Sequence, residues 1–108
     1  MSPKEPKEPL APSDRGILIL TSLAESEKHG YALMKDIEAF AGVTLQPATL
    51  YSALSRLESG GLVEPLPAVE RRKPYRITPA GSRALHRNLS ESAEIARVGL
   101  QRLALNDR

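Results

Sequence analysis

Residues 46–61 read QPATLYSALSRLESGG, and this stretch predicts the helix around which the fold is built. Pro47 suits the first helical turn, because its missing N–H would have no partner there, and Gly60 and Gly61 can leave the helix with a positive φ. Three leucines recur at spacings of four and three and share one buried face: Leu50, Leu54 and Leu57. The other face is small and polar with one guanidinium: Gln46, Thr49, Ser52, Ala53 and Arg56. Such a face fits a DNA groove, and an ordinary amphipathic surface helix is the alternative.

The preceding segment predicts a second amphipathic helix that supports the first. In HGYALMKDIEAFAG, residues 29–42, apolar side chains fall at helical spacing up to a closing Gly42. These apolar positions are Tyr31, Leu33 or Met34, Ile37, Phe40 and Ala41. Residues 43–45 form a short connection, so the two helices predict a helix-turn-helix. A plain αα-hairpin would give the same pattern.

The N-terminal part of the chain predicts an arm and a first helix. Residues 1–12, MSPKEPKEPLAP, hold four of the nine prolines and two Lys-Glu pairs, which predicts a flexible arm. Ser13 or Asp14 then caps a helix. Its apolar positions are Ile17, Leu18, Leu20 and Leu23 or Ala24. Residues 25–28 form a polar break before the next helix.

Beyond Gly61 the periodicity changes to that of short strands. Residues 62–64 and 75–77 are strand-like, and three prolines bound the connection between them. That connection presents three consecutive cations: Arg71, Arg72 and Lys73. A two-stranded ribbon with a basic tip, placed after a recognition helix, is the plan of a winged helix. The tip can bind phosphate or a minor groove, and a charged loop in solvent is the alternative.

The positive charge of the chain is localised. The net charge is +2, but residues 1–45 carry five Lys and Arg against seven Asp and Glu, a net −2. Residues 46–88 carry seven against three, a net +4, and residues 89–108 carry three against three. A basic patch that starts at the proposed recognition helix favours binding to a polyphosphate, because each neutralised phosphate releases condensed counterions.

The last segment predicts one long helix that joins two copies of the chain. Thr78 caps it, Pro79 takes its first position, and it runs for about 27 residues, or about 40 Å. One apolar stripe has a mean spacing of 3.6 and consists of Leu85, Leu89, Ala93, Ala96, Leu100 and Leu103. A second set lies on another side: Ile95, Val98 and Leu105. A small domain can cover one side, so we predict a homodimer, and contact of the second set with the chain's own first helix is the alternative. The predicted dimer contacts are Leu85, Leu89, Ile95, Ala96, Val98, Leu100 and Leu103.

Composition bounds the class of protein. The 108 residues make one domain's worth of chain, with residues 13–78 as a winged helix-turn-helix and residues 79–108 as a dimerisation helix. The fold class is mainly α, with a small β wing. The chain has no cysteine, no run long enough to span a membrane and no signal-peptide segment, which predicts a soluble, cytoplasmic protein.

Catalysis is not expected from this sequence. The two histidines, His29 and His86, are far apart, and neither a nucleophile motif nor a Gly-rich phosphate loop follows a strand. Histidines and carboxylates do not cluster at metal-ligand spacing. We therefore predict no enzyme activity, no cofactor and no metal. The alternative to DNA binding is a winged-helix module that contacts an acidic protein.

Three motifs in order resemble the PadR-like family of prokaryotic winged-helix transcriptional regulators. They are HGYALMKDIE (29–38), PATLYSALSRLESGGLVE (47–64) and YRITPAG (75–81), and the chain is most similar to the short, single-domain branch. The resemblance implies a dimeric repressor whose TLYxxLxRLE helix enters the major groove, and a possible small-molecule effector. Ala48 stands where the family commonly has Gly, and the wing lacks the glycines that usually ease its turn.

We therefore predict a DNA-binding set from three elements. It comprises Gln46, Thr49, Tyr51, Ser52 and Arg56 of the recognition helix, Lys35 of the supporting helix, and Arg71, Arg72 and Lys73 of the wing. Tyr51 is expected to combine core packing of its ring with a hydroxyl that reaches phosphate. For Lys35, plain solvation is the alternative. His29 is interpreted as a polar helix-start residue, and a pH switch or a DNA contact is the alternative.

Overall fold

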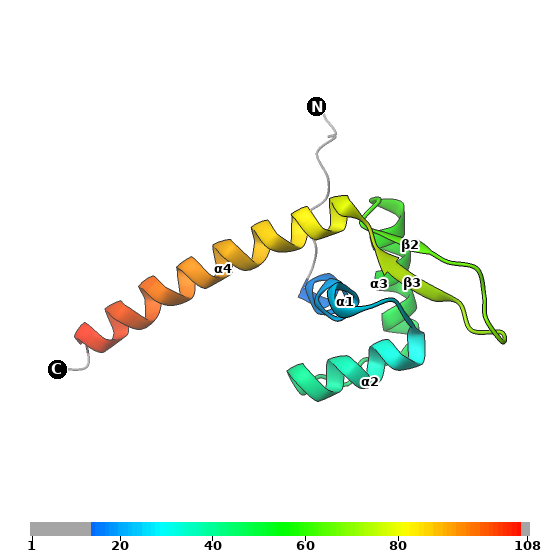
Figure 1. Ribbon diagram of the computed structural model, residues 1–108. Coiled ribbons are helices and arrows are strands. Elements are labelled where there is room, and N and C mark those ends of the chain that lie inside the picture. The colour runs from blue at the N-terminus through cyan, green and yellow to red at the C-terminus, as the bar shows by residue number, and fades with distance from the viewer. Residues whose placement is uncertain (1–13, 107–108) are drawn as a thin grey trace, which may run out of the picture.

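The computed structural model describes residues 14–106, and four helices with three short strands account for most of them (Figure 1). In chain order the elements are α1 (Asp14–Glu25), β1 (Lys28–His29), α2 (Gly30–Ala41), α3 (Pro47–Ser59), β2 (Val63–Pro65), β3 (Pro74–Ile77) and α4 (Pro79–Asn106). The predicted arm at residues 1–12 and the candidate cap Ser13 lie outside the described residues. The predicted class, a mainly helical winged helix with a small sheet, is confirmed.

The core forms around α1, which contacts α2, α3, β3 and α4. Ile19 and Leu20 of α1 are fully buried. They meet an almost entirely aliphatic set from the other elements: Leu33, Ile37, Leu45, Leu50, Leu54, Leu57, Leu62, Val63, Tyr75, Ala84 and Leu85. Burial of this apolar surface, at roughly 25 cal/mol per Å², is the main drive that holds the helices together.

The sheet is antiparallel with the order β1-β3-β2, so it has one strand more than the predicted ribbon. Lys28 pairs with Tyr75 and His29 with Pro74, whereas the sequence predicted a polar break ending at Lys28. A strand of two residues is too short to carry a period-two pattern, which is why this prediction was wrong. The strand predicted at residues 62–64 is shifted by one residue to Val63–Pro65, and Pro74 opens β3.

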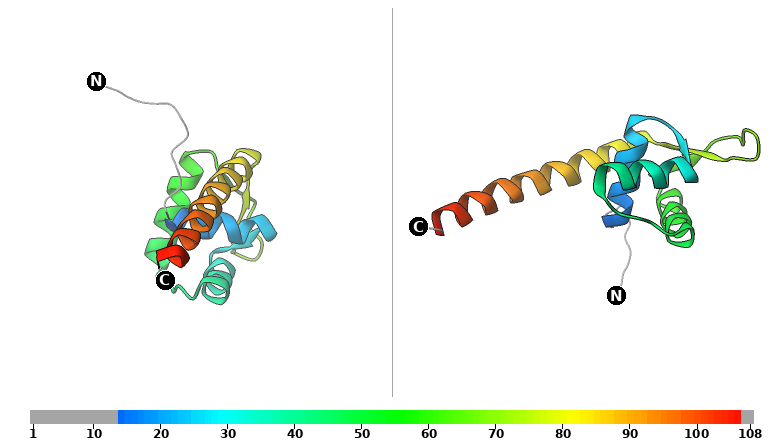
Figure 2. Two further views of the ribbon diagram at one scale, coloured as in Figure 1. Left: turned by 90° about the vertical axis from the view of Figure 1, so that its left-hand side faces the viewer. Right: turned by 90° about the horizontal axis from the view of Figure 1, so that it is seen from below.

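Helix α4 starts inside the domain and then leaves it. Thr78 Oγ1 accepts a hydrogen bond from the Gly81 N–H at 3.0 Å, as its predicted capping role requires, and donates to the Gly61 carbonyl at 2.7 Å. Among its 28 residues only Gly81, Ala84 and Leu85 are buried, all in the first two turns. Figures 1 and 2 show the rest of α4 projecting away from the other elements. No helix within residues 14–106 is both long enough and apolar enough to cross a membrane.

Candidate nucleic-acid interface

The outer face of α3 is made of small side chains. At 100° per residue, the side opposite the buried leucines carries Ala48, Ser52, Ser55 and Ser59, and all four are exposed. Arg56 lies beside this line, is exposed, and makes no ion pair with another described residue. A helix whose outward side chains are this short can approach the floor of a groove closely, and hydroxyls can both donate to and accept from base edges.

The structure shifts the predicted face of α3 by part of a turn. Ala53, which the sequence placed on the polar face, packs against the core, and Thr49 is half-buried. The prediction from the sequence missed Ser55 and Ser59. Placing the outer face opposite the centre of the three leucines, instead of centring it on Arg56, would have included both. Gln46 is exposed at the N-cap position but makes no side-chain capping bond. Ser52 lies on the outer line, where it was predicted to be.

Tyr51 lies on the flank of α3 that meets α2. A Cβ added to Gly30, the first residue of α2, would collide with the Tyr51 hydroxyl, so the ring end rests on the Gly30 main chain. Tyr51 is 48% exposed and is not part of the buried core, in contrast to the predicted core packing. Its hydroxyl lies against the start of α2. The sequence had instead predicted that this hydroxyl reaches a phosphate. Tyr51 braces one helix of the pair against the other.

The wing ends in a two-residue turn with an unusual backbone. Val69 and Arg72 exchange two main-chain hydrogen bonds of 2.8 and 2.9 Å, which close the loop around Glu70 and Arg71. Both loop residues have positive φ, 51° at Glu70 and 69° at Arg71. This is the conformation that Asn-Gly usually adopts in hairpins, and a charged residue with a Cβ pays about 1–2 kcal/mol for it.

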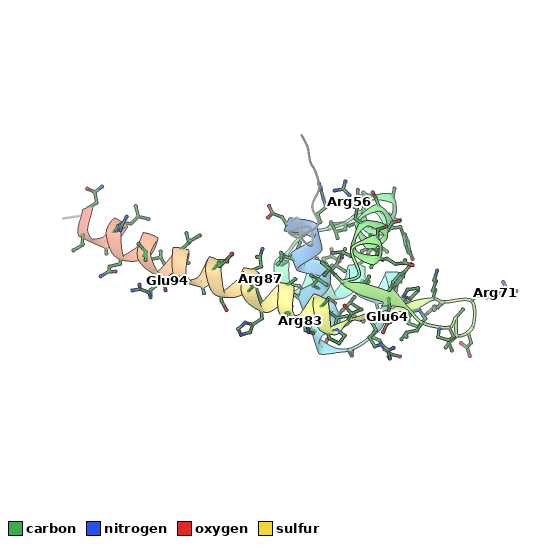
Figure 3. All side chains as sticks on the ribbon, turned by 90° about the horizontal axis from the view of Figure 1, so that it is seen from above. Arg56, Glu64, Arg71, Arg83, Arg87 and Glu94 are labelled. Atoms are coloured by element: carbon green, nitrogen blue, oxygen red, sulfur yellow. The ribbon has the colours of Figure 1, made fainter. Side chains whose placement is uncertain are left out.

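The three wing cations differ in their surroundings. Arg72 Nη1 lies 3.2 Å from His29 Nε2, and Lys73 Nζ lies 5.9 Å from the centroid of the Tyr75 ring. Arg71 makes no hydrogen bond or ion pair with the rest of the described chain, and Figure 3 shows it at the outer end of the wing. Of the predicted trio, Arg71 is therefore the cation most available to a ligand.

The basic region predicted from the charge count is spread over more than one surface. Arg76 is paired with Glu64 at 2.7 Å on the outside of the sheet. Arg83 and Arg87 lie on the proximal part of α4, away from the wing tip (Figure 3). Lys35 is exposed on α2, with its Nζ 6.0 Å from the centroid of the Tyr31 ring. The unpaired charge near α3 and the wing thus comes from four side chains: Arg56, Arg71, Arg72 and Lys73.

Tyr75 joins the wing to the recognition helix. It is 8% exposed in the middle of the sheet. Burial raises the pKa of the Tyr75 phenol, and the nearby Glu58 carboxylate and Tyr51 phenol raise it further. Both of these neighbours belong to α3, and Tyr75 shares the hydrophobic core with Leu54 and Leu57 of that helix, so the root of the wing lies close to the recognition helix.

The apolar residues of α4 fall into two groups. Leu85 packs in the core of its own domain, at 7% exposure, so it is unavailable for the dimer contact to which the sequence assigned it. Further along, large side chains are openly exposed: Leu89, Ile95, Leu100, Leu103 and Leu105. Ala93 and Ala96 are exposed between them, and Val98 is half-buried. The chain's own first helix does not cover this part of α4.

Comparison with known proteins places this geometry in a family. A Streptomyces fradiae protein of 37.1 kDa in transposon TN4556 is 40% identical over 84 residues, but the chain spans about a quarter of that protein's length. The Mycobacterium tuberculosis transcriptional regulator Rv3488 is 38% identical over 73% of this chain and 76% of its own. A PadR family transcription regulator from Clostridium difficile R20291 superposes with a TM-score of 0.77 at 29% identity, over 84% of this chain and 99% of its own. The family model of the PadR-like transcriptional regulators matches residues 19–87, and the chain belongs to that family.

Proposed function

We propose that the chain is a homodimeric, sequence-specific DNA-binding repressor that reads an inverted-repeat operator. The observation that carries the proposal is the outer face of α3, where Ser52, Ser55 and Arg56 are exposed on a helix held rigidly by its three buried leucines. In this proposal α3 enters a major groove, and Arg56 donates to a base, because a guanidinium pairs bidentately with guanine. Repression, as opposed to activation, is proposed from the resemblance to the PadR-like family alone.

The wing supplies contacts that do not depend on sequence. Arg71 stands at the outer end of the wing with no partner among the described residues, which suits it to a phosphate or a neighbouring minor groove. Arg72 and Lys73 lie closer to the protein body, against His29 and Tyr75 respectively. We assign most of the wing's direct DNA contact to Arg71.

Dimerisation through α4 follows from its exposed apolar surface. Five large apolar side chains are exposed along α4 beyond its first two turns, and a second copy that covers apolar surface there gains free energy at roughly 25 cal/mol per Å². A two-fold pair of this kind presents two α3 helices to successive major grooves about 34 Å apart. The operator is then an inverted repeat, and a single asymmetric footprint would exclude this geometry.

The test is binding to the DNA upstream of the protein's own gene, beside a scrambled duplex of equal length, across a salt series. We expect tight binding to the first and weak, salt-sensitive binding to the second. Arg56→Ala should reduce the difference between the two duplexes by about 1–3 kcal/mol. Arg71→Ala should weaken both duplexes alike and lower the salt slope by about one.

A charge-matched control and a rival outcome complete the experiment. Arg97 lies on α4, far from α3, and pairs there with Glu94 at 2.6 Å. Arg97→Ala removes the same charge and should change neither the difference between the two duplexes nor the salt slope. Equal effects of the Arg56 and Arg71 substitutions would mean that neither is the base reader. Absence of binding to either duplex at low salt would favour the second candidate function, a module whose basic wing contacts an acidic protein, for which the unpaired Arg71 is again the natural contact.

A further inference from the structure

We propose that His29 is a positioning residue that couples the wing to the two helices of the helix-turn-helix. The coupling concerns the site proposed above, so its effect on operator binding rests on that function. Four residues from four elements meet here: His29 of β1, Gly30 of α2, Tyr51 of α3 and Arg72 of the wing. We call this group the His29 junction.

His29 belongs to the sheet and to a helix at once. Its main chain is extended, with φ −83° and ψ 170°, and pairs with Pro74 of β3. It is also the N-cap of α2, where its Nδ1 lies 3.3 Å from the Ala32 nitrogen. The other ring nitrogen, Nε2, lies 3.2 Å from Nη1 of Arg72. The imidazole therefore stands between the wing and the first turn of α2.

Proton counting shows that these two contacts compete. The Ala32 N–H and the Arg72 guanidinium can only donate, so each needs an acceptor on the ring. A neutral imidazole carries one N–H and offers one acceptor nitrogen. The ring can serve the wing or cap α2, but not both in one tautomer. The structure directs the Ala32 N–H at Nδ1, so the cap forms when Nδ1 is the acceptor. Because Arg72 is charged, its hydrogen bond to an unprotonated Nε2 is the stronger of the two, and we assign the acceptor to the wing at the expense of the cap.

The junction extends from the wing to α3 through Gly30. Gly30 follows His29 directly, and the Tyr51 hydroxyl occupies the space where any larger residue at position 30 would place its Cβ. A displacement of the His29 main chain therefore moves the surface on which Tyr51 rests. In this way the contact of Arg72 with His29 sets the position of the wing relative to the outer face of α3. The wing and α3 can occupy neighbouring grooves of one DNA duplex only if this relative position is kept.

Two substitutions separate the roles of the imidazole. His29→Asn keeps a good N-cap acceptor near the Nδ1 position but has no atom at the Nε2 position. His29→Gln places an amide oxygen further out, within reach of Arg72, but is a poorer cap. We expect His29→Asn to leave the urea unfolding midpoint at or above that of the unmodified protein and yet to weaken operator binding about 3- to 10-fold. His29→Gln should retain most of the binding. A residue with only a structural role would not change binding and stability in opposite directions.

A double-mutant cycle tests the contact itself. Arg72→Ala should weaken operator binding about 3- to 10-fold in the unmodified protein and less than about twofold in the His29→Asn background. Arg71→Ala, which removes a neighbouring cation without touching His29, should cost the same in both backgrounds. Additive effects of Arg72→Ala and His29→Asn would overturn the proposal.

A measurement without DNA keeps this inference separate from the proposed function. The ¹⁵N order parameters of residues 69–72 report wing motion on the picosecond-to-nanosecond timescale and should fall in His29→Asn but not in His29→Gln. If they fall while neither Arg56→Ala nor Arg71→Ala affects any DNA complex, the DNA-binding function fails and the coupling stands. If Arg56 and Arg71 govern operator binding but His29→Asn leaves the order parameters unchanged, the coupling is refuted.

Discussion

At the scale of single residues, two glycines of α4 meet opposite surroundings. A Cβ at Gly81 would collide with the carbonyl oxygen of Leu62, a main-chain atom that cannot rotate away, whereas a Cβ at Gly99 meets nothing within 4 Å. Gly81→Ala should therefore destabilise the fold by roughly 1–3 kcal/mol. Gly99→Ala should stabilise it by about 1 kcal/mol through helix propensity. Urea unfolding at one fixed protein concentration measures both, and a Gly81→Ala variant that is not destabilised would contradict the packing of α4 on Leu62.

Tyr75 predicts how stability depends on alkaline pH. The pKa of its phenol is raised in the folded state, first by burial and then by Glu58 and Tyr51, so the charged form is disfavoured there. The unfolded chain loses this proton at about pH 10. The contribution of Tyr75 is thus fully present below that pH and is lost as the pH rises through the folded pKa. Unfolding midpoints between pH 8 and 11 should fall less steeply in Tyr75→Phe, and identical profiles would exclude Tyr75 as the cause.

At the scale of elements, the wing turn holds strain that substitution can relieve. Glu70 and Arg71 both have positive φ, which Asn and Gly adopt more readily. Glu70→Asn with Arg71→Gly should raise the free energy of unfolding by about 1–2 kcal/mol while weakening DNA binding, because the tip cation is lost. Glu70→Asn alone keeps Arg71 and should give part of the stability without that loss of binding. A destabilised double variant would show that the turn is not of this type.

The elements also show how far the sequence could predict the fold. The helices were predictable because leucines at spacings of three and four leave little choice, and Thr78 and Gly42 mark a helix start and a helix end. The strand β1 was not, since two residues carry no pattern and only pairing with β3 defines them. The outward residues of α3 were partly predictable: Ser52 and Arg56 are exposed as expected. Ser55 was missed because the face was centred on Arg56 instead of on the buried leucines.

Some features depend on contacts between distant segments and could not be read from the sequence. The approach of Tyr51 to Gly30 joins residues of two helices, and that of Arg72 to His29 joins the wing to β1. Nothing in the local sequence separates Arg71 from Arg72, yet only Arg71 lacks a contact in the described chain. The surroundings of Arg72 follow from the strand register, in which His29 lies opposite Pro74.

At the scale of the whole molecule, the exposed half of α4 predicts the oligomeric state. Leu100→Glu with Leu103→Glu places two carboxylates on the proposed contact stripe and should convert a dimer into a monomer in sedimentation experiments, because burying unpaired charges is costly. The winged domain should stay folded by circular dichroism. Gln101→Glu adds one charge on the polar side of α4 and serves as the control. A protein that sediments as a monomer before any substitution would refute the dimer.

The continuity of α4 from Pro79 to Asn106 links the domain and the proposed contact without a hinge. The number of residues in α4 therefore sets both the orientation and the distance of each winged domain relative to the proposed contact. One residue inserted after Asn88 turns each winged domain by about 100° around the α4 axis and shifts it by about 1.5 Å along that axis. Neither winged domain of the proposed dimer would then face its half-site. Seven inserted residues add almost two full helical turns, so each winged domain moves about 10 Å outward and keeps nearly its original orientation. Such a protein would ignore the natural operator and recognise one whose half-sites stand further apart.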